Sequence, residues 1–230
     1  MASGAGMPRI VVFLGPSMPH DEARSVLDAD YRPPARRGDV LAAARDGADI
    51  ICLIDGVFFQ DSSVAHKEIL EALQMGVRVI GASSMGALRA AEMDVYGMEG
   101  VGEIYRAYRC GEIVADDEVA LLFDPVTLEP LSEPLVNIRH NLRLAVNEGF
   151  IDKQTAADLL EIARARYFPS RSYENMMKDA TGRIPGEKLN QFRRFLETRR
   201  ADLKREDAKR ALRRAADVAR ELAASSCSSS

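Results

Sequence analysis

The sequence predicts an α/β fold: a small, mainly parallel sheet with flanking helices, followed by a mostly helical C-terminal region. Three observations support this. Short apolar runs that end in glycine-containing loops recur in the first part of the chain, segments of helical length separate them, and the later part is nearly continuous in helical pattern. Strands that alternate with helices at this spacing are typical of a parallel sheet.

Three apolar, β-branched runs are the predicted strands. They are Arg9–Leu14, Asp49–Ile54 and Val77–Ile80, and a glycine follows each of them within two residues. The carboxyl ends of parallel strands share one edge of the sheet, where ligands of such proteins collect. We therefore expect the loops that follow these strands to line one edge and to hold the functional residues.

Helices are predicted between and after these strands. In the first part they cover His20–Leu27, Val64–Met75 and Gly102–Arg109. The run Glu118–Phe123 is expected to be a short strand. In the C-terminal region the predicted helices are Glu133–Asn147, Asp152–Phe168, Tyr173–Ala180, Gly186–Thr198 and Asp202–Ala224.

The last predicted helix is amphipathic, with arginines and lysines away from its apolar face. That face consists of Leu203, Ala208, Leu212, Ala215, Val218 and Leu222. It suits either packing against the rest of the chain or docking of a partner protein. The predicted organisation is a flexible N-terminus at 1–8, an α/β core at 9–140, a helical region at 141–224 and a disordered tail at 225–230.

Composition limits the function classes. The 230 residues carry a net charge of −4, which argues against general binding of nucleic acid or of an anionic membrane. No apolar stretch is long enough to span a bilayer, and the N-terminus does not resemble a secretory signal, so we expect a cytoplasmic protein. Three scattered cysteines without metal-site spacing, and the absence of a P-loop or GxGxxG motif, predict no metal and no cofactor.

The segment Gly81–Arg89 joins a predicted strand to a predicted helix and carries the clearest chemical signal. A serine on such a sharp turn, here Ser84, can present its hydroxyl at the sheet edge as a nucleophile. The helix-start amides of Met85 and Gly86 could then stabilise an oxyanion. The local pattern is A-x-S-x-G, with alanine in place of the first glycine. The alternative is that Ser83 or Ser84 only caps the helix.

A nucleophilic serine needs a base, and the candidates are Lys67 and His66, in the first turn of the helix after the second strand. A buried lysine loses affinity for its proton and can deprotonate a serine. The helical projection, however, points Lys67 away from the apolar face and towards Glu71, which favours a solvated lysine. His66 lies at the border of the apolar face, where it could be the base or a structural histidine.

Two further loops belong to the predicted site. Gly15-Pro16-Ser17 could offer amides to an oxyanion or phosphate, or could be a plain turn. Asp55 could accept a hydrogen bond from the base.

Three more residues could contact a substrate. Phe58 and Phe59 could hold an extended peptide tail, or could be turn and core residues. Arg89 could balance a carboxylate or thiocarboxylate, or could form an ordinary surface pair.

The chain resembles the TfuA family at these same motifs. The resemblance spans roughly residues 10 to 140, and the phrase GASSMGALRAAE is its most specific part. The matching segments are 10–17, 53–60, 66–69, 81–92, 97–105 and 116–119.

The resemblance implies a cytoplasmic partner of a YcaO enzyme in backbone thioamidation of a precursor peptide or target protein. It implies a hydrolase-like Ser–Lys pair that releases sulfide from a thiocarboxylated ThiS-like carrier. Carried onto this chain, the serine is Ser84, with Ser83 as the adjacent alternative, and the lysine is Lys67. Two other functions stay open: a non-catalytic adaptor that strengthens YcaO binding to its peptide, and a peptidase or esterase unrelated to sulfur.

Overall fold

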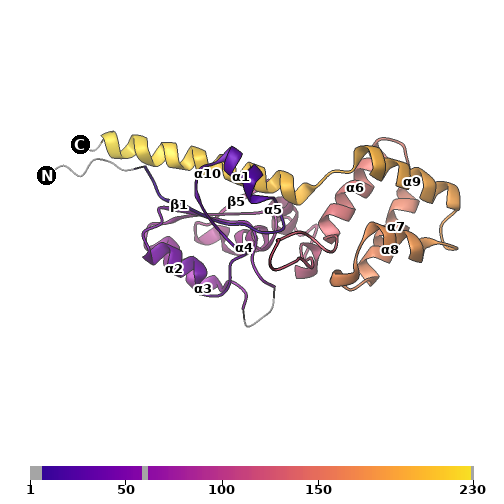
Figure 1. Ribbon diagram of the computed structural model, residues 1–230, viewed down its shortest axis with the longest axis horizontal. Coiled ribbons are helices and arrows are strands. Elements are labelled where there is room, and N and C mark those ends of the chain that lie inside the picture. Colours follow the sequence, from indigo (N-terminus) through magenta and orange to yellow (C-terminus); the bar gives the residue numbers. More distant parts are fainter. Residues whose placement is uncertain (1–6, 59–61, 229–230) are drawn as a thin grey trace. The chain divides into compact units, whose positions relative to one another are not determined.

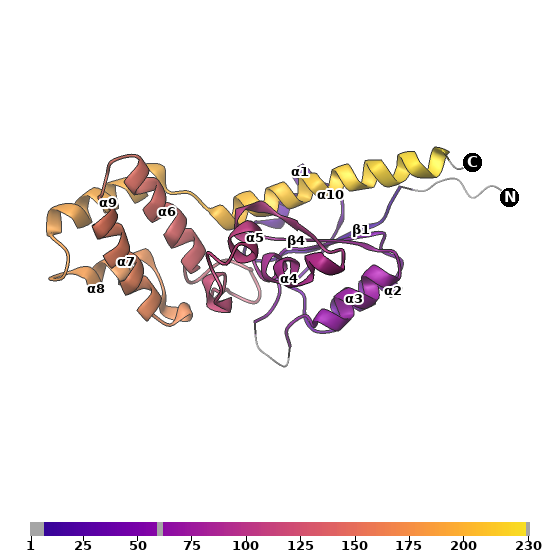
Figure 2. The same ribbon diagram turned by 180° about the vertical axis from the view of Figure 1, so that it is seen from behind.

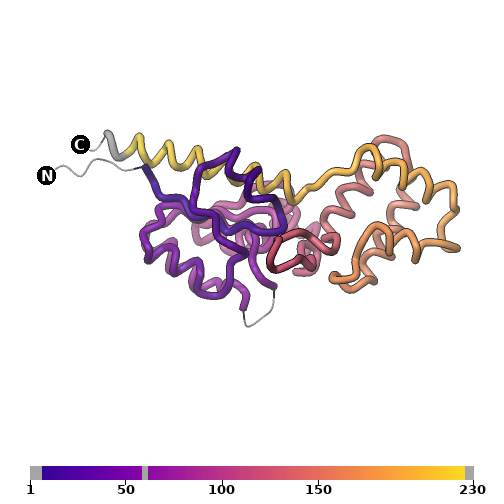
Figure 3. Tube along the Cα trace, viewed as in Figure 1, coloured from indigo at the N-terminus to yellow at the C-terminus, as the bar shows by residue number. Residues whose placement is uncertain are grey.

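The chain folds into two compact units. The computed structural model describes residues 7–58 and 62–228. One unit contains the residues up to Val114 together with those from Lys204 onward, and the other is Ala115–Leu203. Figure 3 traces the chain from the first unit into the second and back into the final helix.

The first unit contains a five-stranded parallel sheet with the order β2-β1-β3-β4-β5. The strands are β1 (Ile10–Phe13), β2 (Asp30–Arg32), β3 (Ile50–Leu53), β4 (Arg78–Ala82) and β5 (Glu99–Val101). The three predicted runs are the central strands, which confirms the α/β assignment. In this order the chain reverses its direction of progress across the sheet between β1 and β3, the place where α/β proteins bind ligands.

Helices cover both faces of the sheet. The helices α2 (Asp39–Arg45), α3 (His66–Gln74), α4 (Met85–Met93) and α5 (Gly102–Arg109) pack on one side. On the other side lie α1 (His20–Val26) and the long α10 (Leu203–Ser228), as Figures 1 and 2 show from opposite directions.

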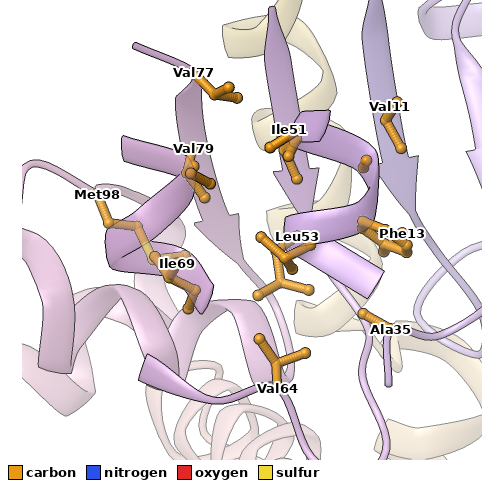
Figure 4. Packing of buried hydrophobic residues seen from close by; sticks show 14 of the residues in the cluster. Val11, Phe13, Ala35, Ile51, Leu53, Val64, Ile69, Val77, Val79 and Met98 are labelled. Atoms are coloured by element: carbon orange, nitrogen blue, oxygen red, sulfur yellow. The ribbon is translucent and has the colours of Figure 1, made fainter. Parts of the chain in front are cut away.

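Side chains of each central strand alternate between the two faces, because strand residues have a period of two. Val11, Phe13 and Leu53 point into the first core, a cluster that also contains Ile69 of α3 (Figure 4). Their neighbours Val12 and Cys52 point into the second core, beneath α10.

The helix α10 packs on the sheet as part of the first unit. Its buried residues there are Ala208, Ala211, Leu212, Ala215 and Val218. The chain therefore divides at Val114 and Lys204, not at the predicted boundary after residue 140. The helix also continues to Ser228, beyond the predicted start of a disordered tail at 225. Residues 1–6 of the predicted flexible N-terminus lie outside the described residues, as do 229–230.

The second unit is helical. Its long helices are α6 (Leu135–Asn147), α7 (Lys153–Ala165), α8 (Tyr173–Ala180) and α9 (Gly186–Arg199), which surround an apolar core containing Phe192 and Phe195. Short 3₁₀ turns occur at Asp116–Glu118 and Phe168–Ser170, and another follows α4 in the first unit at Asp94–Tyr96.

The predicted strand Glu118–Phe123 is wrong, since only Phe123 forms an isolated bridge, to Pro130. In the described part of the chain, no helix combines the length and apolar content needed to cross a bilayer.

Candidate functional site

Three loops meet at the carboxyl edge of the sheet, as the strand pattern predicts. Asp55, directly after β3, joins them: its Oδ2 accepts hydrogen bonds from the amides of Gly15 and Ser17 at 2.9 and 3.0 Å. Its Oδ1 accepts a hydrogen bond from the Ser17 hydroxyl at 2.7 Å, and that hydroxyl accepts one from Ser83 Oγ at 2.9 Å. Residues after β1, β3 and β4 are thus connected in one buried network.

The turn after β4 is strained. Ser83 has φ of 65°, a region that L-residues other than glycine seldom adopt, and the amide of Ser84 donates to the carbonyl of Ala82 at 2.7 Å. The hydrogen bond joins two residues that are two positions apart, and the residue between them has a positive φ. These two features define the rare, strained form of the γ-turn. Ser84 follows with φ −118° and ψ −124°, after which α4 begins.

Glycines allow the strand and the helix to approach this closely. A Cβ on Gly86 would lie 1.7 Å from the carbonyl oxygen of Leu53, and one on Gly81 would lie 2.2 Å from the carbonyl oxygen of Gly86. The close approach of the strand and helix backbones therefore requires small residues around Ser84. The same requirement holds in enzymes that present a nucleophile on a strand–turn–helix junction.

Ser84 contacts a lysine that is distant in sequence. Lys204 Nζ donates a hydrogen bond to Ser84 Oγ at 3.0 Å, and both side chains are 2% exposed. Ser84 occupies the N-cap position of α4, but its side chain makes no capping hydrogen bond. The hydroxyls of Ser83 and Ser84 are thus bonded to Ser17 and Lys204, and the interpretation of either serine as a simple helix cap is wrong.

Asp55 also lies near the lysine. Its Oδ1 is 4.0 Å from Lys204 Nζ, and the carboxylate is 2% exposed. The expectation that Asp55 would accept a hydrogen bond from the base is met only in part, because 4.0 Å is an ion-pair separation and exceeds hydrogen-bond distance. Burial of an amine favours its neutral form, whereas a carboxylate at this range favours its charged form.

A second buried carboxylate fixes the first turns of α10. Asp207, on the turn after Lys204, is fully buried and accepts a hydrogen bond from the amide of Ile104 at 2.8 Å, at the start of α5. Burial raises the pKa of Asp207, and the amide hydrogen bonds and Arg210 oppose this effect. Gly102, with φ of 99°, leaves room for the carboxylate: a Cβ there would lie 2.2 Å from it.

The predicted base Lys67 does not lie at this site. Its side chain is 86% exposed and its Nζ is 4.0 Å from Glu71, as the helical projection allowed. The prediction that Lys67 is buried beside Ser84 is therefore wrong, and Lys204 supplies the amine instead.

His66 and Arg89 belong to a separate cluster between α3 and α4. Both contact Glu92 Oε2, at 2.7 Å from His66 Nε2 and 2.6 Å from Arg89 Nη1. Arg89 Nε also donates to the carbonyl of Val64 at 2.9 Å. The ordinary structural interpretation of these two residues agrees with these contacts.

Several amides expected to face an oxyanion are already engaged. Those of Gly15 and Ser17 bind Asp55, and the amide of Gly86 donates to the carbonyl of Ile54 at 3.2 Å. Met85 has no acceptor for its amide among the residues that the structure describes. Of the predicted donors, Met85 is the one whose N–H remains available next to Ser84.

The remaining predicted site residues do not help to define the site. Pro16 and Phe58 are half-buried, and Phe59 lies outside the described residues. Across residues 7–58 and 62–228, no group of three histidine, cysteine or acidic side chains is arranged to hold a metal ion.

The sequence did contain a signal for Lys204. The buried stripe of α10 consists of residues 208, 211, 215 and 218, which are separated alternately by three and four positions. Lys204 lies four positions before Ala208 and so continues the same stripe. A lysine on a buried helical stripe is rarely accidental, because lysines are seldom fully buried without a partner.

Residues 55–172 match the family model of TfuA-like proteins. Comparison with curated proteins finds none that matches. The family match includes Asp55 and Ser84 and ends before α10, which carries Lys204. The match extends over half of the chain, and the chain therefore belongs to the TfuA-like family, a family of YcaO-associated proteins.

Proposed function

We propose that this protein hydrolyses the thiocarboxylated C-terminus of a ThiS-like sulfur carrier, with Ser84 as nucleophile and Lys204 as base. The supporting observation is the buried hydrogen bond of 3.0 Å between Lys204 Nζ and Ser84 Oγ. A serine is a weak nucleophile unless an adjacent base takes its proton, and a desolvated lysine is one of the groups that can do so. A lysine needs no third residue to select a tautomer, as a histidine would.

In the first step, the neutral amine of Lys204 takes the proton of Ser84 as Oγ bonds to the carbonyl carbon of the thiocarboxylate. In this proposal the amide of Met85, which follows Ser84 in the chain, donates to the oxyanion. The tetrahedral species then collapses: the carbon–sulfur bond breaks, the proton passes from Lys204 to sulfur, and hydrosulfide leaves. The carrier remains as an ester on Ser84.

In the second step, Lys204 takes a proton from a water molecule while the water oxygen attacks the ester carbon. The carbon–oxygen bond to Ser84 then breaks, and Lys204 returns the proton to Ser84 Oγ. The balance is one thiocarboxylate and one water converted to one carboxylate, one hydrosulfide and one proton. Hydrosulfide is a much better leaving group than an amine, so this site needs less transition-state stabilisation than a peptidase.

Family membership supports the choice of acyl group, which the serine turn alone would leave open. A YcaO enzyme activates a peptide amide, and a sulfur nucleophile then replaces the amide oxygen. Release of hydrosulfide at a protein docked on YcaO supplies that nucleophile in the cytoplasm without loss to solvent. The partners in this proposal are the carrier, the YcaO enzyme and its peptide or protein substrate.

The test follows a ThiS-type carrier with a C-terminal thiocarboxylate by intact-mass spectrometry. The wild type is expected to convert thiocarboxylate to carboxylate. Ser84→Ala should lower the rate by roughly a thousandfold or more, since loss of a nucleophile removes the covalent route. Lys204→Met keeps the buried volume without the amine and should lower the rate by roughly a hundredfold or more.

Lys67→Met is the matched control, because it removes an amine that is 86% exposed and pairs with Glu71. It should react at the wild-type rate. Wild-type conversion no faster than the uncatalysed reaction would refute the hydrolase, and equal loss in both lysine variants would refute the assignment of the base.

The alternative is a non-catalytic adaptor that strengthens YcaO binding to its peptide. The observation that favours it is the low exposure of both reacting groups, 2% for Ser84 and 2% for Lys204, which limits access of a carrier tail. An adaptor would leave carrier conversion at the background rate while lowering the Kd of YcaO for its peptide, and Ser84→Ala would not change that effect.

A further inference from the structure

Ser17 lies at the centre of a buried chain of hydrogen bonds beside the Ser84–Lys204 pair. Ser83 Oγ donates to Ser17 Oγ at 2.9 Å, and Ser17 Oγ donates to Asp55 Oδ1 at 2.7 Å. All three side chains are at most 2% exposed. Hydrogen bonds in such surroundings are worth more than in water, and an unmade one costs more.

One end of this chain restrains the strained turn. Ser83 is the residue at φ of 65°, and its hydroxyl bond to Ser17 ties the turn to the loop after β1. A strained conformation persists only where its surroundings overdetermine it. Because Ser84 is the next residue, the orientation of Ser83 sets the direction in which Ser84 leaves the turn.

The other end of the chain faces the lysine. Asp55 Oδ1, which accepts the Ser17 hydroxyl, is 4.0 Å from Lys204 Nζ. The Asp55 carboxylate is held in place by the amides of Gly15 and Ser17 as well. Ser17 therefore contacts, through one side chain, both the turn that carries the nucleophile and the carboxylate beside the amine.

We propose that Ser17 is a positioning residue, which through Ser83 and Asp55 keeps Ser84 Oγ within hydrogen-bond distance of Lys204 Nζ. It touches neither the carrier nor the reacting atoms. The geometry requires a hydroxyl at this position, because Ser17 Oγ accepts one hydrogen bond and donates another. This inference rests on the proposed hydrolase function.

The experiment measures kcat and KM for carrier hydrolysis, and separately the rate at which a serine-directed fluorophosphonate labels Ser84. Ser17→Ala is expected to lower kcat and the labelling rate about tenfold each, with little change in KM, because it removes two buried hydrogen bonds. A tenfold change corresponds to about 1.4 kcal/mol, within the range that the loss of one or two such bonds produces. Ser17→Thr retains the hydroxyl and should recover most of both rates.

A double-mutant cycle identifies the connection to the turn. Ser83→Ala breaks only the bond to Ser17, whereas Ser17→Ala breaks that bond and the one to Asp55. The double variant is therefore expected to be no slower than Ser17→Ala alone, while independent effects would multiply. Thermal unfolding of each variant checks that the rates refer to folded protein, and Ser25→Ala, an exposed serine bonded only to a local carbonyl, is the control.

The outcomes separate the two proposals. An active wild type with Ser17→Ala unchanged in kcat and labelling overturns the positioning role and leaves the hydrolase intact. Multiplicative effects in the cycle, or failure of folded Ser17→Thr to recover either rate, also overturn it. A wild type inert towards both the carrier and the fluorophosphonate overturns the hydrolase and the positioning role together.

Discussion

Cys52 and Cys110 differ strongly in environment and so in expected reactivity. Cys52 is fully buried in β3, and burial raises the pKa of its thiol to about 12. Cys110 is exposed at the end of α5. Because the thiolate is the reactive form, Cys52 is both inaccessible and protonated at pH 8.

We expect iodoacetamide at pH 8 to alkylate Cys110 in the native protein and to leave Cys52 unmodified, as measured by peptide mass mapping. In denaturant both should react. Since the folded-state pKa of Cys52 is raised, burial of this thiol favours folding below the ordinary thiol pKa of about 8.5 and the benefit is lost towards pH 12. Rapid alkylation of Cys52 in folded protein at pH 8 would contradict its placement in the core.

At this scale the sequence predicted the strained serine turn that carries Ser84, the proposed nucleophile, but not the lysine that contacts it. Ser84 could be found because a strand–turn–helix junction with small residues is a local pattern. Lys204 could not be paired with it, because their contact joins residues 120 positions apart and no local spacing encodes it. Lys67 was predicted from the family resemblance and from its place in the helix after the second strand, near the expected sheet edge, yet its helical projection pointed it towards solvent.

At the scale of elements, α10 depends on a glycine in another element for its placement. Gly102, the first residue of α5, combines φ of 99° with space for the Asp207 carboxylate. Gly97 has a similar φ of 104° but nothing within 4 Å of a Cβ placed there. The two positions therefore differ in crowding and not in backbone strain.

Gly102→Ala is expected to lower the melting temperature more than Gly97→Ala, because the first adds a clash with Asp207 to the strain that both share. Positive φ costs an alanine about 1–2 kcal/mol. The extra loss at Gly102 should also reduce carrier hydrolysis, since Asp207 lies one turn from Lys204. Differential scanning calorimetry and the hydrolysis assay check both, and equal losses in the two variants would show that Asp207 does not crowd this position.

The helices and strands with a clear local sequence pattern could be predicted, and those without one could not. The central strands are continuous apolar runs, and the long helices carry clear amphipathic patterns. The edge strands β2 and β5 were missed, because each is only three residues long, contains no continuous apolar run, and is identified by its pairing with the neighbouring strand. The run at Glu118–Phe123 looked like a strand, yet Val119 and Ala120 are buried without forming one.

At the scale of the molecule, the last helix completes the core of the first unit. Burial of Leu212 and Val218 contributes about 1.5–3 kcal/mol each, and three buried alanines add to this. The sum is comparable with the whole stability of a typical domain, about 5–15 kcal/mol. This tertiary role explains why a boundary drawn from the change in composition near residue 140 missed the return of α10 to the sheet.

A variant truncated after Leu203 is therefore expected to lose the fold of its sheet unit and to aggregate. The reason is that one apolar face of the sheet would lose its cover. Solubility after expression and near-ultraviolet circular dichroism, compared with the full-length chain, test this. A soluble truncated protein with an unchanged cooperative transition would show that α10 contributes little to the core.

The position of Lys204 on the last helix also has a consequence during translation. A ribosome synthesises Ser84 well before it reaches α10, and the emerging chain has the serine turn without its amine. The pair can form only when the second unit has been made and α10 has left the exit tunnel. If the proposed function holds, a nascent chain that still lacks α10 has no base beside Ser84 and should not discharge a carrier.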